Sequence, residues 1–216
     1  WPAPPQSDRT VISVADLSFA FPDGRRMWDR LSFTLYRGQK IALVGPNCLG
    51  LIGTGAGVNA SFAAGYPQKG SIAFFSQSGA LCVAILDWAL GENIGFSKFV
   101  SLGNKAVIDE SHMLDYLADD PDTNVILGYI ENVENGQAFL KAARRVSREK
   151  PVIMIKSGST AAGAKAASSH TGAIAGSDQA YSAAFNQTGI IRAPDVATLF
   201  NLAQAFSTQP LPKGPR

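Results

Sequence analysis

The sequence has little of several features that define whole classes of protein. Its 216 residues include two cysteines, Cys48 and Cys82, which are too few for a disulfide framework and indicate reduced thiols. No apolar run approaches the roughly 20 residues of a membrane span. The N-terminal WPAPPQSDR lacks the charged start and apolar core of a signal peptide. A formal net charge of +2 is too small to favour nucleic acid or an anionic membrane. We therefore expect a cytoplasmic protein with neither as a partner.

Histidine is equally scarce, and this scarcity bears on metals. His112 and His170 are the two histidines of the chain, and neither belongs to a Cys or acidic spacing motif, so no metal site is predicted. His112 lies at a predicted helix start, facing solvent, and we expect it to be inert. A basic cluster near the end of another predicted helix suits the negative end of the helix dipole, with a nucleic-acid patch as the weaker alternative. The cluster comprises Lys141, Arg144, Arg145, Arg148 and Lys150.

From residue 67 onward, short apolar runs alternate with helical patterns. The runs SIAFF, FSKFVSLG, NVILGYI, PVIMIK and GIIRA predict five strands. Five amphipathic stretches follow them: Gly79–Gly91, one capped by Asp109, one carrying Phe139 to Val146, one from Asp178 to Gly189, and one from Asp195. This alternation favours an α/β fold with a doubly wound parallel sheet. We expect a flavodoxin-like five-stranded sheet in the order 2-1-3-4-5 over residues 67–216.

Residues 1–45 have a different sequence pattern, one typical of short β-strands. VISVADL, LSFAF, LSFTLY and KIALVG predict short strands, with turns at Pro22-Asp23-Gly24 and Arg37-Gly38. A piece of this size buries too little core to be stable by itself. It therefore either adds strands to the edge of the sheet or packs loosely as an N-terminal appendage, and both alternatives stay open. Residues 46–66 are rich in Gly, Ala and Asn and are interpreted as a linker.

The stretch LSFAFPDGRRMWDRLSFTLYRGQKIALVGPN resembles the opening of an ABC-type ATPase domain, in which the aromatic residue matching Phe21 stacks on adenine. A phosphate loop needs two glycines five positions apart, followed by Lys and Ser or Thr. Gly45 and Gly50 have this spacing, but Leu51 and Ile52 occupy the last two positions. We regard the loop as degenerate and expect no ATP hydrolysis there.

Three segments of the predicted sheet can carry chemistry. Ser157–Gly172 is a run of small residues that leaves the His170 imidazole reachable as a nucleophile. The segment SQSG opens the helix after the first strand, where unpaired main-chain amides favour an anion. Glu131 ends the third strand, and its carboxylate can accept a hydrogen bond from Nδ1–H of His170. Each has a simpler alternative: a solvated loop histidine, Ser78 as a helix cap, and a solvated carboxylate.

The segments SQSGA, YIE and SSHTG, together with GPNCLGLIGTGAGVNASFAAGYPQKG, resemble the NDP-forming acyl-CoA synthetases, relatives of the succinyl-CoA synthetase α subunit. The resemblance runs from Gly45 to the C-terminus. It implies that His170 is a transient phosphohistidine and that Glu131 orients it. It also implies a phosphate-binding set comprising Ser76, Gln77, Ser78, Gly79, Thr171 and Gly172. Residues 46–66 would match the end of a CoA-binding domain.

Because Gly45-Pro46-Asn47 fits both resemblances, we interpret the chain as a chimera joined there, with one divergent family as the alternative. The complete ligase converts acyl-CoA, ADP and phosphate to the acid, CoA and ATP. The resemblance therefore implies CoA, ATP or ADP, and Mg²⁺, bound by CoA-binding and ATP-grasp partners and not by this chain. We expect no full turnover from the chain alone. A non-catalytic chimeric fold, an ATP-binding ABC-type fragment and a homo-oligomer remain open.

Overall fold

Four of the five parallel strands in the second part of the chain are buried along most of their length, because helices cover both faces of their sheet. The computed structural model describes residues 10–20, 24, 26–39, 43–45, 47–158 and 177–210. The chain forms two compact units, Trp1–Ala42 and Leu43–Arg216. The five parallel strands belong to the second unit. They are β5 (Lys69–Ser76), β6 (Phe96–Ser101), β7 (Val125–Ile130), β8 (Val152–Lys156) and β9 (Ile191–Arg192).

The parallel strands lie in the order β6-β5-β7-β8-β9, which confirms the predicted flavodoxin-like order 2-1-3-4-5. Two further strands, β3 (Gly50–Gly53) and β4 (Val58–Ser61), extend the sheet to seven strands. β3 pairs antiparallel with both β4 and the outer edge of β6. The interpretation of residues 46–66 as a linker is therefore wrong for this stretch. The unpaired main-chain groups at the edge of β6 supply the partner that the weakly patterned sequence does not reveal.

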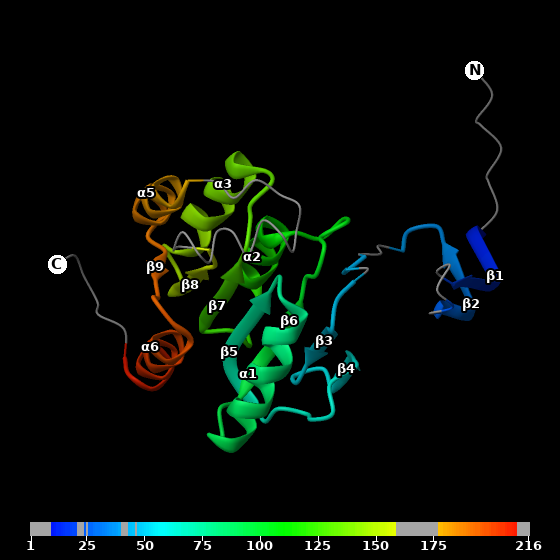
Figure 1. The fold of residues 1–216 in the computed structure, drawn as a ribbon, viewed down its shortest axis with the longest axis horizontal. Coiled ribbons are helices and arrows are strands. Elements are labelled where there is room, and N and C mark those ends of the chain that lie inside the picture. The colour runs from blue at the N-terminus through cyan, green and yellow to red at the C-terminus, as the bar shows by residue number, and fades with distance from the viewer. Residues whose placement is uncertain are drawn as a thin grey trace. The chain divides into compact units, whose positions relative to one another are not determined.

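Helices form a layer on each face of the sheet (Figure 1). On one face, α1 (Gly79–Gly91) and α6 (Val196–Thr208) bury apolar side chains against Phe74 and Phe99. On the other, α2 (Glu110–Asp119), α3 (Gly136–Val146) and α5 (Asp178–Thr188) pack around Phe75. The neighbours Phe74 and Phe75 therefore point into different cores, as the period of a strand requires.

Side chains placed before the helices fix where they begin. The predicted caps Asp109 and Asp195 accept main-chain N–H groups of the first turns of α2 and α6. The predicted cap Asp178 is instead the first residue of α5, whose N-cap is Ser177. The Asp178 carboxylate is used by an ion pair with Arg192 on β9. Gly189 ends α5 with a φ of +81°, a conformation that glycine adopts without strain.

The N-terminal unit is a two-stranded antiparallel sheet of β1 (Thr10–Ala20) and β2 (Arg26–Tyr36). It is the β-rich appendage expected from the sequence. The predicted turn after β2 forms, with Gly38 at a φ of +86° and a hydrogen bond from the Gln39 N–H to the Tyr36 carbonyl. The predicted strand KIALVG is wrong in its described part, because residues 43–45 lie outside any strand. Phe21 and part of the first predicted turn lie outside the described residues.

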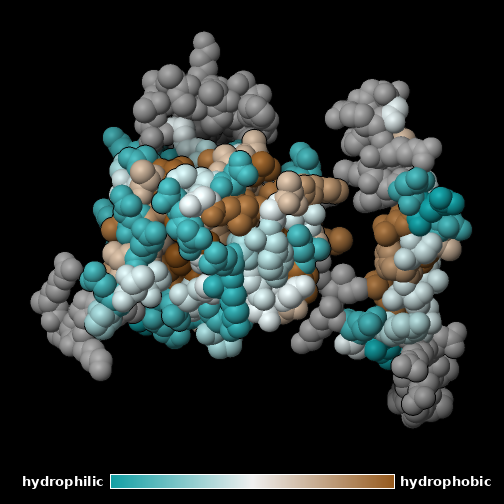
Figure 2. All heavy atoms as spheres, turned by 90° about the horizontal axis from the view of Figure 1, so that it is seen from below, coloured by the Kyte–Doolittle hydropathy of each residue, from teal (hydrophilic) through white to brown (hydrophobic). Residues whose placement is uncertain are grey.

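On the face seen in Figure 2, hydrophilic side chains are interspersed with apolar ones. Phe62 is the most exposed of the large apolar residues described, at 90%. Among the described residues, no helix is both long and apolar enough to cross a membrane.

Candidate active site

A cleft of about 550 Å³ lies where the chain leaves the carboxyl ends of β5, β6 and β7. This edge is where ligands bind in parallel α/β sheets. Four short segments line it: Gln77 to Ala80 after β5, Gly103 to Lys105 after β6, Glu131, Asn132 and Glu134 after β7, and Asn47 with Cys48. The cleft therefore brings together SQSGA and Glu131, two of the three predicted elements.

The first helix points its N-terminus at this cleft. Ser78 is the N-cap of α1, and its hydroxyl oxygen accepts the N–H of Leu81 at 3.3 Å. Ser76 is fully buried, and its hydroxyl is hydrogen bonded to the main-chain N–H and carbonyl of Ser78, both at 3.0 Å. The Ser78 hydroxyl is thus used in capping the helix, and the Ser76 hydroxyl is used in hydrogen bonds to the Ser78 main chain. A ligand in the cleft would meet the partial positive charge of the helix start.

Gln77 is not free to bind a ligand through its side chain. Its amide oxygen accepts the main-chain N–H groups of Glu131 at 2.9 Å and Asn132 at 3.1 Å. Its amide nitrogen donates to the Asn132 carbonyl at 2.8 Å and to Oε2 of Glu110 at 3.0 Å. Gln77 therefore joins the end of β5 to the end of β7 and to the start of α2.

A buried ion pair that the sequence analysis did not find stands next to this amide. Lys105 Nζ lies 3.2 Å from Oε2 of Glu110, and their side chains are 4% and 1% exposed. Nζ also donates to the main-chain and side-chain oxygens of Asn132, at 3.0 and 3.2 Å. Burial raises the pKa of Glu110 above its usual value, although Lys105 opposes the shift. The signal available in the sequence was Lys105 itself, a cation two positions beyond the end of the predicted strand FSKFVSLG, at the same sheet edge.

Upstream residues form another wall of the cleft. The Asn104 side-chain oxygen accepts the N–H of Asn47 at 3.0 Å, and the Ser101 hydroxyl accepts the N–H of Leu49, also at 3.0 Å. Gly103 has a φ of +59°, and a Cβ placed there would lie 1.9 Å from the Asn47 carbonyl oxygen. Glycine is required at this position both by the backbone conformation and by the close approach of residue 47.

The two cysteines occupy different environments. Cys48 lines the cleft, whereas Cys82 is fully buried in α1. Burial raises the pKa of the Cys82 thiol to about 12, although hydrogen bonds with Ser76 and Ser101 oppose the shift. Cys82 is therefore a thiol at neutral pH, and Cys48 is the cysteine that a molecule in the cleft would meet.

The predicted phosphate loop has another use in this fold. Gly50 begins β3, and Leu51 and Ile52 continue it, so the segment leads into an antiparallel strand and not into a helix. A Cβ on Gly50 would lie 2.2 Å from the Ala60 carbonyl oxygen. Close pairing of β3 with β4 therefore explains Gly50. A phosphate loop, by contrast, sits at a helix N-terminus.

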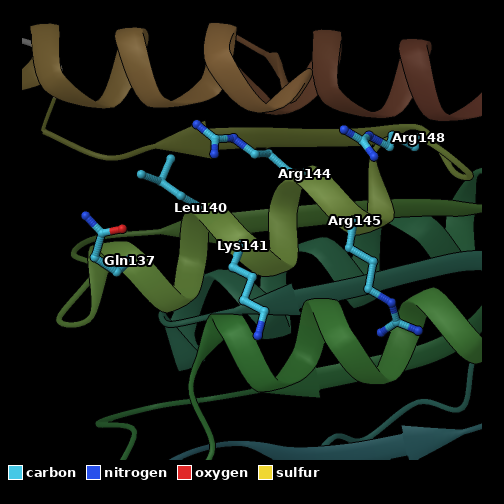
Figure 3. A pocket seen from close by; sticks show the side chains of 6 residues that line it. All are labelled: Gln137, Leu140, Lys141, Arg144, Arg145 and Arg148. Carbon is cyan, nitrogen blue, oxygen red and sulfur yellow. The ribbon is translucent and has the colours of Figure 1, made fainter.

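A second, shallow hollow of about 310 Å³ runs along the outer side of α3 (Figure 3). Lys141, Arg144, Arg145 and Arg148 line it. Arg145 points toward α2 and pairs with Asp115 and Asp119. The ammonium of Lys150 donates to the carbonyls of Leu117 and Asp120, near the end of α2. Contacts within the fold thus account for Arg145 and Lys150, and we assign no ligand to the hollow.

The remaining predicted residues are placed as follows. His170, Thr171 and Gly172 lie outside the described residues. Nδ1 of His112 lies 2.6 Å from Oδ1 of Asp109, within the capping box of α2. Among the residues that the structure describes, no group of three or more His, Cys, Asp or Glu side chains is arranged to hold a metal ion.

Comparison with known proteins shows the family to which the chain belongs. The sequence pattern of the succinyl-CoA ligase-like flavodoxin domain matches residues 69–206, and the chain belongs to this family. The chain is 55% identical over 163 residues to the ADP-forming acetate–CoA ligase I of Archaeoglobus fulgidus, which covers 76% of this chain and 24% of that protein. It is 45% identical over 206 residues to the α subunit of ADP-forming acetate–CoA ligase II of Pyrococcus furiosus, covering 95% and 44%.

A solved structure supports the same assignment of the fold. The dinucleotide-forming acetyl-coenzyme A synthetase 1 of Candidatus Korarchaeum cryptofilum, in complex with phosphate and ADP, superimposes with a TM-score of 0.76 at 45% identity. The superposition covers 79% of this chain and 37% of that one. The chain thus spans less than half the length of each of these relatives.

The comparisons give no support to a separate ATPase origin for residues 1–45. Because the alignment with the Pyrococcus furiosus α subunit covers 95% of the chain, it extends into that stretch. The interpretation of the chain as a chimera with an ABC-type fragment is therefore not supported.

Proposed function

We propose that this chain is the phosphohistidine-carrying domain of an ADP-forming acyl-CoA synthetase. In this proposal His170 takes the phosphoryl group from an acyl phosphate and transfers it to ADP, and Glu131 orients the imidazole. The observation that carries the proposal is the meeting of SQSGA and Glu131 in one cleft, at the carboxyl ends of β5 and β7. High identity to ADP-forming acetate–CoA ligases supports it.

The chemistry of the cleft suits a phosphoryl group on a histidine. The start of α1 supplies partial positive charge that favours the phosphate dianion. A carboxylate facing the same space can accept a hydrogen bond from Nδ1–H of an imidazole, which leaves the unprotonated Nε2 as the nucleophile. In the transfer, the Nε2 lone pair forms the new bond to phosphorus while the bond between phosphorus and the leaving oxygen breaks.

The described residues on either side of 159–176 support a place for His170 beside Glu131. The main-chain N–H of Ser157 donates to the carbonyl of Ile130 at 2.9 Å, immediately before Glu131. On the return side, the Tyr181 hydroxyl in α5 accepts the N–H of Val133 at 2.9 Å. Ser157 and Tyr181, which lie a few residues outside 159–176 on either side, therefore both contact residues 130–133.

We assign CoA, the nucleotide and its Mg²⁺ to CoA-binding and ATP-grasp partner domains or subunits. The acyl substrate of the complete reaction is a small carboxylate in the proposal, as in the acetate–CoA ligases that the chain resembles.

Chemical phosphorylation tests the proposal on the chain itself. Phosphoramidate is the probe, because an imidazole nitrogen displaces ammonia from it and forms a phosphohistidine. We expect mass spectrometry to find one acid-labile phosphoryl group on the peptide that contains His170. The variant His170→Ala should acquire none, and His112→Ala, which alters the other histidine, should react like the wild type. Equal labelling of the His170→Ala variant would refute the assignment.

A further inference from the structure

We propose that Gln77, Lys105 and Glu110 are positioning residues that fix the main chain at Glu131 and so set where its carboxylate stands in the cleft. The inference rests on the proposed role of Glu131 and adds residues that none of the family motifs assigns to this task. Three separate segments converge on it: the end of β5, the loop after β6 and the first turn of α2.

Gln77 uses its full hydrogen-bonding capacity in this arrangement. A side-chain amide has two donor hydrogens and an oxygen that accepts two bonds. The oxygen accepts the N–H groups of Glu131 and Asn132, while the nitrogen donates to the Asn132 carbonyl and to Glu110. A rotated amide would set its NH₂ group against two N–H donors. The side chain therefore has one acceptable orientation, and the turn after β7 is held by three bonds to it.

Glu110 and Lys105 maintain that orientation. Oε2 of Glu110 accepts from both the Gln77 amide and the Lys105 ammonium, so the carboxylate specifies which end of the amide faces α2. The ammonium of Lys105 places all three of its donors, on Glu110 and on both oxygens of Asn132. The main chain of Lys105 has a φ of +51°, which non-glycine residues seldom adopt.

General stabilisation does not account well for this arrangement. Burying an ion pair seldom adds net stability, because both charges lose their water, and apolar side chains of similar volume often serve as well. Oε1 of Glu110 is buried without a hydrogen-bond partner among the described residues, which adds to the cost. The bonds that the pair does make end on Asn132 and Gln77, and these residues hold the cleft wall at Glu131. We infer that the buried charges serve to position this wall of the cleft.

Two readouts on a small set of variants test the network. Gln77→Leu removes the acceptor for two amides, so we expect hydrogen exchange at the N–H groups of Glu131 and Asn132 to accelerate at least tenfold. Labelling of His170 by phosphoramidate should slow at least tenfold in the folded protein. The matched control is Gln137→Leu on the exposed side of α3, which should change neither rate.

A swap of the two side chains tests whether hydrogen-bond direction or net charge matters. Gln77→Glu places two carboxylates about 3 Å apart, at the present distance between Gln77 and Glu110, and should slow labelling like Gln77→Leu. Adding Glu110→Gln restores the net charge but not the bonds, because a carboxylate at position 77 cannot donate to the Asn132 carbonyl, and an amide NH₂ at position 110 cannot accept from the Lys105 ammonium. We therefore expect labelling by the double variant to stay slow.

The outcomes separate this inference from the proposed function. Slow labelling at a wild-type thermal midpoint, in both Gln77→Leu and the double variant, supports the positioning role. Recovery of the wild-type rate in the double variant would show that net charge alone is required and would overturn it. Unchanged exchange at Glu131 and Asn132 in Gln77→Leu overturns it, as does a labelling loss that only follows the unfolded fraction. If the wild-type chain takes no phosphoryl group, the proposed function fails, while the exchange experiment still decides whether the network holds the Glu131 main chain.

Discussion

The amide oxygen of Gln77 accepts the main-chain N–H of Glu131 at 2.9 Å, across 54 residues of sequence. This bond links the loop that opens α1 to the only predicted catalytic carboxylate. The family resemblance implies that Gln77 binds phosphate and that Glu131 orients His170, but the Gln77 side chain is bonded to the main chain of Glu131. Gln77 holds the wall of the cleft, and Glu131 faces the space within it.

Gly103 should tolerate no larger side chain. Gly103→Ala forces a residue with a Cβ into a φ of +59° and against the Asn47 carbonyl. We expect the free energy of unfolding to fall by about 2 kcal/mol or more, combining the left-handed penalty and the clash. Urea denaturation measures the change. Gly136→Ala is the control, since a Cβ at that helical glycine meets no atom within 4 Å, and its stability should be equal or slightly higher.

The same truncation should have a large effect on stability at one phenylalanine and almost none at another. Phe74 is fully buried and lies 5.1 Å from Phe99 between ring centroids, whereas Phe62 is 90% exposed. Phe74→Ala should reduce the free energy of unfolding by about 3–5 kcal/mol, because it leaves a cavity. Phe62→Ala should change it by no more than about 0.5 kcal/mol. A large loss for Phe62→Ala in urea denaturation would show that its surroundings are not those described.

The buried carboxyl of Glu110 should make stability depend on pH. Burial raises its pKa in the folded protein above the usual 4.5, so the folded state binds a proton more tightly than the unfolded state. The resulting stabilisation is fully present below the usual pKa and is lost as the pH rises through the raised one. The stability of the wild type relative to Glu110→Gln should therefore be highest in acid and decline with rising pH.

Thermal unfolding of the two proteins from pH 4 upward measures this difference. Groups common to both proteins cancel in it, including the depressed aspartate pKa values such as that of Asp120. A difference in stability that increases with pH would contradict the direction assigned to Glu110.

The two thiols should differ in their reaction with iodoacetamide. With a pKa of about 12, Cys82 carries roughly one thiolate in ten thousand molecules at pH 8 and is also buried. Cys48 lines the cleft and should be the first to be alkylated in the native protein. Peptide mass spectrometry should find Cys82 modified only after denaturation. Inorganic phosphate should slow the reaction of Cys48 if it occupies the cleft.

Much of the second unit could be predicted because its signals are local. Helix α1 begins after a serine cap and ends at a glycine, and both bounds are written in the sequence. Apolar runs separated by helical patterns were sufficient to predict a parallel sheet, since parallel strands need crossovers. The strand order was chosen as a common arrangement of such sheets. By contrast, β3 has four residues, two of them glycine, and depends on pairing with β6 more than forty residues later. No local pattern could reveal that pairing.

The difference between local and long-range signals also decided which site residues could be predicted. Glu131 and SQSGA could be predicted, because the ends of parallel strands meet at one edge. The role of the Gln77 side chain could not, because its partners include main-chain atoms at residues 131 and 132. A main-chain N–H carries no sequence signature. Lys105 and Glu110 were missed for a related reason, since nothing in their spacing announces that both are buried.

The antiparallel pair β3 and β4 has a practical consequence for dividing the chain. A polypeptide begun at Pro67, where the sequence suggests the domain starts, would leave the ladder of β6 open and discard Asn47 and Cys48. Exposed ladders invite pairing between molecules, so such a fragment should aggregate. One begun at Leu43, where the second compact unit starts, would retain both the covered edge and an intact cleft.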